Sequence, residues 1–133
     1  EDRTTRLWDV NTGAELKTVR GLSYRSVTFS PNGRELLLGS ELWTGTLSRK
    51  LKEFDEGKGY SGLGGFSPDG QLIAIPDLKG TVGVWDSVSG ERLSILSGHR
   101  DPVNACAFSP DGEFFLSAAG ARLWERESGL ILW

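Results

Sequence analysis

A five-residue phrase that occurs three times constrains the fold of this chain more than any other feature of its sequence. The phrase is Phe-Ser-Pro-Asn/Asp-Gly, and its copies begin at Phe29, Phe66 and Phe108, roughly 40 residues apart. Each copy predicts a tight turn, because proline presets φ, Asn or Asp hydrogen-bonds to nearby backbone, and glycine tolerates positive φ. Repetition at this period indicates an architecture in which each unit buries its faces against its neighbours.

A second phrase, out of phase with the first, consists of an apolar residue, a tryptophan and a polar residue. A glycine follows five residues after the tryptophan in three copies, whereas Ser48 takes that place in the fourth. The segment from the tryptophan to this glycine predicts a second turn. The four tryptophans are Trp8, Trp43, Trp85 and Trp124.

Short segments with the two-residue period of β-strands flank both kinds of turn, as in residues 103–108. Residues 48–56 come closest to a helical period, but their register from Trp43 predicts a strand instead. Each repeat is therefore predicted to form four short antiparallel strands. Besides the strand that precedes each Phe-Ser-Pro phrase, the predicted strands are 35–38, 71–75 and 113–117, then 81–85 and 121–124, then 16–19, 92–96 and 130–133.

Units of four strands repeated at this period resemble the WD-repeat family of β-propellers. The resemblance covers essentially the whole chain. It is most specific in the last unit, where Gly98-His99 precedes the phrase that begins at Phe108 and Leu123-Trp124-Glu125 follows it. Residues 80–86 are similarly close to the family pattern. The resemblance implies an all-β partial β-propeller of four-stranded antiparallel blades.

The number of repeats predicts an incomplete ring. Residues 1–19 supply a half blade, and further blades are expected at 20–54, 55–97 and 98–133. Propeller rings close with roughly four to eight blades, the chain has no methionine, and Trp133 falls within an expected strand. We therefore expect a segment of a longer propeller, or an arc closed by another chain. Its flanks are expected to be apolar and to need covering by the remaining blades.

The resemblance also implies a structural hydrogen-bond tetrad that is common in the family, made of a His, a Ser or Thr, the Trp and an Asp. His99, Ser117 and Trp124 occupy the matching positions in the last blade, but no Asp lies between Ser117 and Trp124. The middle blade has Asp77, yet Lys79 stands where the Asp is usual, and Gly-His is missing. These blades are expected to rely on packing and turns more than on tetrads.

The distance between the two phrases predicts the length of one loop in each blade. This distance is longest in the blade that contains Phe66, and the missing residues of the other blades fall between the second and third strands. Two-residue turns are therefore expected at 39–40 and 119–120. In the family this loop lies on the face that carries the connections between blades, a common partner surface. The short loops are expected to flatten that face locally.

Composition argues against several classes of function. The net charge of −3 disfavours a broad binding surface for nucleic acid or an anionic membrane. The single Cys excludes an internal disulfide and a Cys-rich metal site, and the single His removes most zinc chemistry. No apolar run is long enough to cross a bilayer, and no N-terminal stretch has the pattern of a signal peptide. We expect a cytoplasmic protein with no cofactor, no metal and no catalytic residues.

Two motifs that suggest catalysis or nucleotide binding have simpler structural interpretations. Residues 57–62 fit G-x-G-x-x-G, but that motif needs a strand before it and a helix after it, whereas Phe66-Ser67-Pro68 starts a turn. A flexible connection between blades is favoured. His99, Asp101 and Ser109 or Ser117 suggest a hydrolase triad, but neither serine has the context of a nucleophile elbow. A structural His paired with a strand Ser and the Trp ring is favoured instead.

Other polar or reactive residues are interpreted in the same way. Cys106 lies in an expected strand and is interpreted as a small hydrophobic residue. Asp69 and Asp111 lack calcium-loop spacing and are turn residues by their place in the repeat. Residues 49–52 include the one basic run, a candidate phosphate site. We favour protection of a blade's outer edge, because lysine there opposes pairing with another strand. The run is Arg49, Lys50 and Lys52.

Exposed aromatic and arginine residues in the blade connections are the better candidates for partner recognition, because Tyr and Arg are enriched in interface hot spots. The resemblance implies a non-catalytic scaffold segment that binds protein or peptide through these connections. The alternative is a regulatory propeller segment of a larger signalling or enzymatic chain; an enzyme site in the central channel lacks a convergent set of His, carboxylate or metal ligands. The partner-binding candidates are Arg20, Tyr24, Arg25, Lys58, Tyr60, Arg100 and Asp101.

Overall fold

The computed structural model describes residues 3–21, 24, 26–54 and 62–119, together with the backbone of 121–125. These residues form β-strands and turns, and no helix that could cross a membrane occurs among them. The strands are β1 (Thr4–Trp8), β2 (Glu15–Arg20), β3 (Val27–Phe29), β4 (Glu35–Leu38), β5 (Glu41–Thr44), β6 (Lys50–Glu53), β7 (Gly65–Phe66), β8 (Leu72–Pro76), β9 (Thr81–Asp86), β10 (Arg92–Ser97), β11 (Ala105–Phe108), β12 (Phe114–Ala118) and β13 (Ala121–Glu125).

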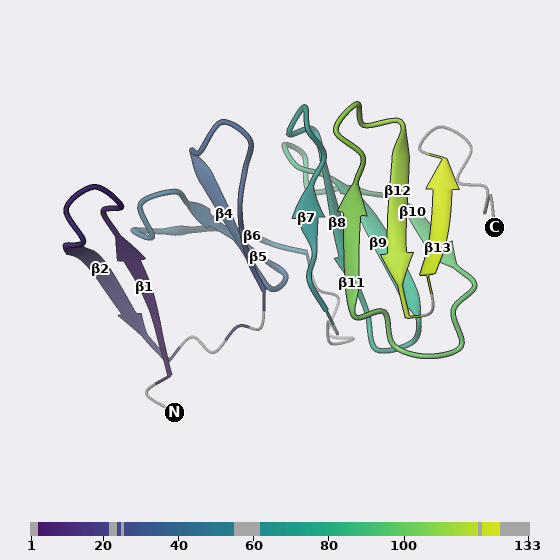
Figure 1. Cartoon of the computed structure of the whole chain (residues 1–133), viewed down its shortest axis with the longest axis horizontal. Helices are drawn as coiled ribbons and strands as arrows, with labels where there is room; N and C mark the ends of the chain where they lie inside the picture. Colours follow the sequence, from purple (N-terminus) through teal and green to yellow (C-terminus); the bar gives the residue numbers. More distant parts are fainter. Residues whose placement is uncertain (1–2, 22–23, 25, 55–61, 120, 126–133) are drawn as a thin grey trace.

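The strands form antiparallel sheets that follow one another along the chain (Figure 1). The first sheet pairs β1 with β2, the next two have the orders β3-β4-β5-β6 and β10-β9-β8-β7, and the last has the order β11-β12-β13. In each sheet, consecutive strands are hydrogen-bonded neighbours. The predicted all-β partial propeller of four-stranded antiparallel blades is confirmed. The strand predicted at 130–133 lies outside the described residues.

The predicted strands and the observed strands differ mainly at their ends. The strand predicted at 35–38 has those bounds in β4, and residues 71–75 and 113–117 shift by one position in β8 and β12. The segment 48–56 contains β6, as its register from Trp43 predicts. The hairpin between β4 and β5 has the predicted two-residue turn, with Gly39 at φ 60° and Leu38 paired with Glu41. Positive φ at the first turn position is what glycine supplies in this kind of hairpin.

The three Phe-Ser-Pro phrases form the same hydrogen-bonded turn. The backbone N–H of each serine donates to the carbonyl five residues later at 2.9 Å, and the glycine N–H donates back to the serine carbonyl at 2.8–2.9 Å. The serine Oγ accepts the N–H five residues later at 2.9–3.0 Å, and the Asn or Asp Oδ1 accepts the N–H two residues later at 2.9–3.0 Å. Each glycine has positive φ, between 70° and 76°. The serines are Ser30, Ser67 and Ser109, and the glycines are Gly33, Gly70 and Gly112.

The turn after each tryptophan is also built by a polar side chain. Oδ1 of Asp9 accepts two backbone N–H groups at 2.9 and 2.7 Å, and Asp86 does the same at 3.0 and 2.6 Å. In the blade without the glycine, Oγ1 of Thr44 accepts the N–H groups of the two residues that close the turn, at 3.1 and 3.2 Å. There Leu47 adopts φ 56° while its side chain is buried. Burial of this leucine offsets a backbone conformation that costs roughly 1–2 kcal/mol for a residue with a Cβ.

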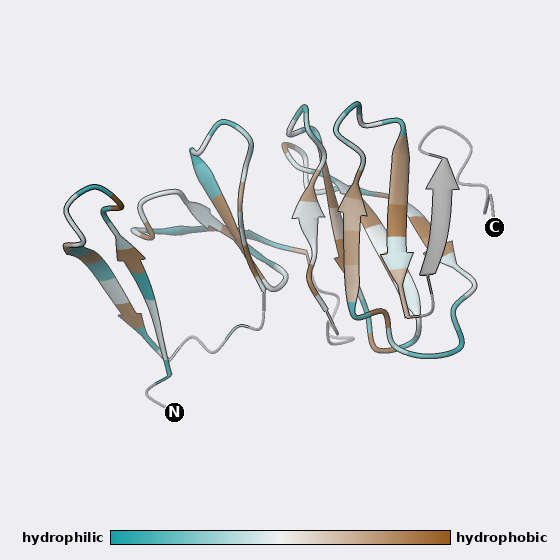
Figure 2. Ribbon diagram, in the orientation of Figure 1, coloured by the Kyte–Doolittle hydropathy of each residue, from teal (hydrophilic) through white to brown (hydrophobic). Residues whose placement is uncertain are grey.

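Among the described residues, three apolar clusters lie between successive sheets. Figure 2 shows hydrophobic residues along the strands and hydrophilic residues at the turns. Adjacent positions of β4 serve two of these clusters, because neighbouring residues of a strand face opposite sides of the sheet. Leu36 and Leu38 pack with Leu7 and Val19 of the first sheet, whereas Leu37 packs toward the third sheet. The third cluster, between β7–β10 and β11–β13, includes Ala74, Val82, Val103, Phe115 and, at its margin, Leu96, Cys106 and Phe108.

The first sheet covers only part of its neighbour. Val27 and Phe29 of β3 are half exposed, although their cross-strand partners Leu38 and Leu36 on the same face are buried. For the described residues of the first sheet (β1 and β2), the expectation of an apolar flank is only partly correct. Trp8 is exposed, but Arg6 forms an ion pair with Glu15 at 2.8 Å beside it. The expectation overlooked that the strand period places these charged side chains opposite the packed face.

Candidate functional site

A contact between two loops of different blades builds the candidate partner-binding face. One is the loop between β8 and β9 (residues 77–80), and the other is the start of the β10–β11 connection (residues 98–101). A Cβ atom on Gly80 would lie 2.7 Å from the carbonyl oxygen of His99 and 2.8 Å from that of Asp101. Both distances are shorter than a carbon atom tolerates, and Gly80 also has φ 79°. The absence of a side chain at this position therefore allows the loops to pack backbone against backbone.

Asp77 holds the first of these loops in shape. Its Oδ1 accepts the backbone N–H groups of Lys79 and Thr81 at 2.8 and 2.9 Å, and its Oδ2 accepts the Thr81 hydroxyl at 2.6 Å. Burial opposes ionisation of Asp77, but the hydrogen bonds from Thr81 and Lys79 outweigh burial and lower the pKa of the carboxyl. The loop is thus ordered around an ionised carboxylate.

His99 holds the second loop against the last sheet. Its Nε2 lies 2.7 Å from Oγ of Ser117, which is fully buried in β12. The structure therefore brings together two of the three residues that the family resemblance assigned to a tetrad. The side chain of Trp124, the third, lies outside the described part of the structure. With His99 bonded to the sheet, the connection has a fixed starting point next to Gly80.

Four exposed side chains lie on the two packed loops. Arg100 and Asp101 were predicted as partner-binding candidates, and both are exposed. Leu78 has 56% of its surface exposed and Lys79 is also exposed, and neither was predicted. The signal for them was the longer connection between the second and third strands of this blade. In the neighbouring blade, the two-residue turn at 39–40 leaves no room for such a protrusion.

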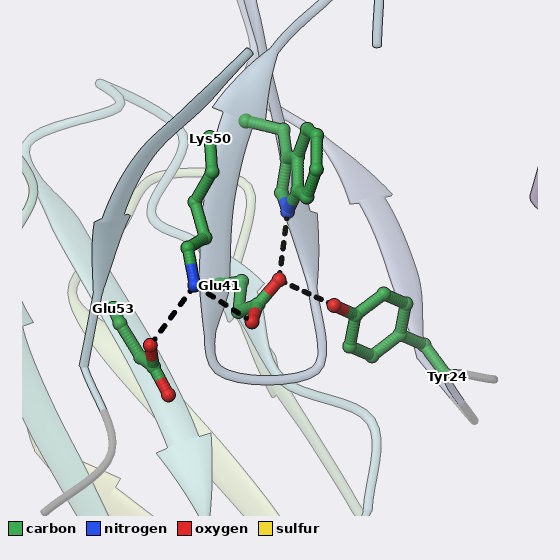
Figure 3. Close-up of polar contacts among 5 residues, drawn as sticks. Tyr24, Glu41, Lys50 and Glu53 are labelled. Atoms are coloured by element: carbon green, nitrogen blue, oxygen red, sulfur yellow. Dashed lines mark hydrogen bonds and ion pairs between the residues drawn. The ribbon is translucent and has the colours of Figure 1, made fainter. Parts of the chain in front are cut away.

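Tyr24 is placed differently from the exposed candidates. It is half-buried, and its hydroxyl donates a hydrogen bond to the carboxylate of Glu41 (Figure 3). The same carboxylate accepts the indole N–H of Trp43 at 2.9 Å and lies 3.1 Å from Nζ of Lys50. Lys50 also pairs with Glu53 at 3.1 Å. We call these five residues the Glu41 network.

Glu41 is the centre of this network. Burial opposes its ionisation, but hydrogen bonds from Tyr24, Trp43 and Lys50 outweigh that effect and lower its pKa. In this arrangement Tyr24 joins the β2–β3 connection to β5 within the blade. Glu41 was not predicted, although a strand period of two places it on the same face as Trp43. That spacing is the sequence signal that could have found it.

Two basic side chains of the run 49–52 also form contacts within a blade or between blades. Lys50 belongs to the Glu41 network, and Nζ of Lys52 donates to the carbonyl of Ser87 at 3.4 Å, in the turn of the next blade. Arg49 is exposed. Two of the three basic side chains therefore connect strands instead of forming an open anion site.

The remaining predicted candidates fall into two groups. Arg20 is exposed at the end of β2, where it pairs with Thr4. Arg25, Lys58 and Tyr60 lie outside the described residues, as does most of the G-x-G-x-x-G segment. Gly62 is described, and a Cβ there would overlap the backbone of Asn104. At that end of the segment, glycine serves close packing of two connections.

The residues considered for catalysis have structural contacts. Ser109 forms the turn described above, with its hydroxyl bonded to Asp111. Burial raises the pKa of the Cys106 thiol to about 12, and its Sγ donates to the carbonyl of Leu63 at 3.1 Å. Within the described residues, no group of three or more His, Cys, Asp or Glu side chains is placed to hold a metal ion.

Comparison with known proteins finds WD repeats. The family model described as WD domain, G-beta repeat matches residues 90–124. The WD repeat-containing protein SL1-17 of Schistosoma mansoni is 32% identical over 127 residues, which cover 89% of this chain and 41% of that protein. The serine-threonine kinase receptor-associated proteins of Dictyostelium discoideum and Gallus gallus are 29% and 27% identical, over 90% and 97% of this chain and 43% and 39% of their own lengths.

The chain thus spans about two fifths of the length of these relatives. The matched family model lies across β10 to β13 and includes Gly98-His99 and the third Phe-Ser-Pro-Asp-Gly turn. The other sheets repeat the same turn chemistry and strand order. On the similarity of its sequence, its repeated turns and its four-stranded antiparallel blades, the chain belongs to the WD-repeat family.

Proposed function

We propose that this chain is a non-catalytic scaffold that binds a protein or peptide partner through a face formed by residues 77–80 and 98–101. We call this the loop face. The packing of Gly80 against the backbone of His99 and Asp101 is the observation that carries the proposal, because it presents exposed side chains from two blades side by side. A rigid framework that positions loops is a common basis of recognition.

The chemistry of the loop face fits a peptide or protein surface. Leu78 offers an exposed apolar contact, and Lys79, Arg100 and Asp101 offer charges of both signs on the same two loops. An apolar contact surrounded by charged groups is the usual composition of a protein interface. The names of the kinase receptor-associated relatives describe proteins that associate with a receptor, which supports a role in binding.

We further propose that additional blades, from the parent chain or from another chain, cover the open side of the first sheet. The exposed Val27 and Phe29 support this, since the strands β1 and β2 reach only Leu36 and Leu38 on the same face. Two more strands beside β1 would extend the cover to β3. The loop face does not depend on which chain supplies them.

A capture experiment with matched variants tests the loop face. The protein is immobilised and the partners bound from a cell extract are compared for wild type and for the Leu78→Ser, Arg100→Ala double variant. Val10→Ser, Arg34→Ala is the control, because both residues are exposed in the turns at the opposite end of the blades. We expect the first variant to lose a partner that the control retains, with unchanged thermal unfolding in both. Equal recovery by both variants would remove the loop face from the proposal.

A further inference from the structure

The two turns of the second sheet differ in charge from the corresponding turns of the other sheets. Residues 30–34 and 44–49, which form these turns, contain two arginines and no carboxylate. In the corresponding turns that the structure describes in the other sheets, every charged residue is acidic. Those turns are 9–14, 67–71, 86–91 and 109–113.

Four positions of the repeat produce this difference. Asn32 stands where the other two Phe-Ser-Pro phrases have Asp, and Thr44 stands where two other turns have Asp. Arg34 and Arg49 stand where the other turns have neutral or acidic residues. Asn32 and Thr44 still accept backbone hydrogen bonds of their turns, so the turn structure does not require the change in charge. A change in the same direction at all four positions favours a role for positive charge at this end of the blade.

The aspartates that Thr44 replaces are ionised in the neighbouring sheets. Backbone hydrogen bonds lower the pKa of Asp9 and Asp86, with the N–H groups of Thr12 and Ser89 as the main donors. Sheets pack about 10 Å apart, and charges are screened over about 8 Å at physiological ionic strength. The acidic turns therefore confine the positive charge to the second sheet without cancelling it.

The two arginines lie on either side of the same strand end. The N–H of Gly45 donates to the carbonyl of Arg34 at 2.7 Å, and the N–H of Thr44 donates to the carbonyl of Arg49 at 2.9 Å. Because Thr44 and Gly45 are consecutive, the arginines flank the end of β5. A Cβ on Gly45 would lie 2.4 Å from the carbonyl oxygen of Gly33, so the two turns pack backbone against backbone. Both arginine side chains are exposed.

Exposed hydroxyl groups belong to the same turn. Oγ of Ser48 lies 2.9 Å from Oγ1 of Thr44 and 3.0 Å from Oγ1 of Thr46. Leu47 is buried between the exposed Thr46 and Ser48 and anchors the turn. Glu35, which follows Arg34, is half-buried at the start of β4 and leaves the two turns with a net positive charge. We define the basic turn patch as Asn32, Arg34, Thr46, Ser48 and Arg49.

We propose that the basic turn patch binds an acidic segment of a partner protein, in which nearby Asp or Glu side chains pair with Arg34 and Arg49. The planar fork of N–H donors in arginine matches the geometry of a carboxylate. The two arginines come from different turns and are both exposed, which suits the spaced carboxylates of a peptide better than one phosphate group. The patch lies at the opposite end of the blades from the loop face, so loss of Arg34 leaves the loop-face partner bound.

A titration followed by nuclear magnetic resonance tests the patch. Tetraglutamate is added to the isotope-labelled protein at constant ionic strength, and the backbone amide signals are recorded. We expect saturable shifts concentrated in residues 32–34 and 44–49. The expected dissociation constant is on the order of 1 mM, because each exposed ion pair contributes little.

Matched variants assign the binding to the two arginines. Arg34→Gln, Arg49→Gln is expected to weaken binding about fivefold or more, because it removes two ion pairs. Arg3→Gln, Lys17→Gln removes the same charge from exposed positions of the first sheet region and is expected to bind as wild type does. Circular dichroism checks that each variant is folded.

Asn32→Asp is a second variant that preserves the turn. Asp69 and Asp111 make the same backbone hydrogen bond in the other two phrases, so the variant adds a negative charge without changing the fold. We expect it to weaken tetraglutamate binding about two- to threefold.

The proposal is overturned if tetraglutamate gives no localised shifts, if Arg34→Gln, Arg49→Gln binds as tightly as wild type, or if the control variant loses binding to the same extent. Unchanged binding by Asn32→Asp would also contradict it. The same titration with inorganic phosphate distinguishes the two kinds of anion. Phosphate is expected to bind more weakly than tetraglutamate, and equal or tighter binding at these residues would overturn the assignment to an acidic segment.

Discussion

Removing the carboxylate of Glu41 is predicted to destabilise the blade far more than removing the neighbouring carboxylate of Glu53. The Glu41 side chain is only 17% exposed and accepts hydrogen bonds from Tyr24, Trp43 and Lys50. Hydrogen bonds to a charged group contribute roughly 1.5–3 kcal/mol each, and a donor left unsatisfied in a part-buried site costs about 1–3 kcal/mol. These contributions overlap because they share one acceptor. We expect Glu41→Ala to lower the free energy of unfolding by about 2–3 kcal/mol.

Glu53→Ala is the matched control. Glu53 contacts the same Lys50 at the same distance of 3.1 Å, but its side chain is 52% exposed. Exposed ion pairs contribute little, so the expected loss is below about 0.5 kcal/mol. Urea unfolding followed by far-ultraviolet circular dichroism gives the free energy of unfolding and the m-value of each variant. Losses that agree within about 0.5 kcal/mol for the two variants, at equal m-values, would refute the central role of Glu41.

The pH dependence of stability gives a second test of the same network. Hydrogen bonds lower the pKa of Glu41 in the folded chain, so its contribution is fully present above the unfolded pKa of about 4.3. The contribution is lost as the pH falls through the folded pKa. The difference in stability between wild type and Glu41→Gln should therefore be largest near pH 7 and shrink below about pH 4. A difference that stays constant down to pH 3 would show that ionisation of Glu41 is not what stabilises the blade.

Three further predictions follow from other contacts. Gly80→Ala should lower the free energy of unfolding by about 2–4 kcal/mol, because its Cβ would overlap the backbone of the next connection. Gly13 has φ 70° but open space around it, so Gly13→Ala should lower the free energy of unfolding by only about 1–2 kcal/mol. Thermal unfolding compares the two variants. His99→Ala should destabilise the chain by about 1–3 kcal/mol, because it removes the hydrogen bond to the buried Ser117. Loss of a specific enzymatic turnover at an unchanged melting temperature would contradict this structural role. Cys106 should resist iodoacetamide at pH 8 in the folded chain and react after denaturation, because burial raises the pKa of its thiol to about 12. Equal labelling rates for the folded and the denatured chain would argue against burial of this thiol.

The repeated turns are the part of the fold that could be predicted in most detail. In each Phe-Ser-Pro phrase, the serine, the Asn or Asp and the glycine form hydrogen bonds with backbone groups within five residues. Such local interactions do not depend on how the blades pack, so the same residues form the same turn three times. The strand ends were less predictable, with shifts of about one residue, because they depend on where cross-strand pairing stops.

The candidate site could be predicted only in part. The connections between blades were identified as its location, and the structure places Arg100 and Asp101 exposed there. Tyr24 was chosen for the same reason, but its hydroxyl binds Glu41 within its own blade. Residue type and loop position alone could not separate these cases, because the difference lies in whether a carboxylate from another strand is within reach.

The sequence by itself determined the repeat, the four-stranded blade and the two kinds of turn, because these arise from spacing and from interactions between near neighbours. The tertiary structure alone decided which polar side chains work together. Glu41 gathers residues from three segments of its blade, and Gly80 lets a loop of one blade pack on the connection to the next. The physical reason is that both sets of contacts join residues that are distant in the sequence. The Glu41 network forms only when the strands of its blade pair, and Gly80 meets the backbone of His99 and Asp101 only when neighbouring sheets stack by burying the apolar cluster between them.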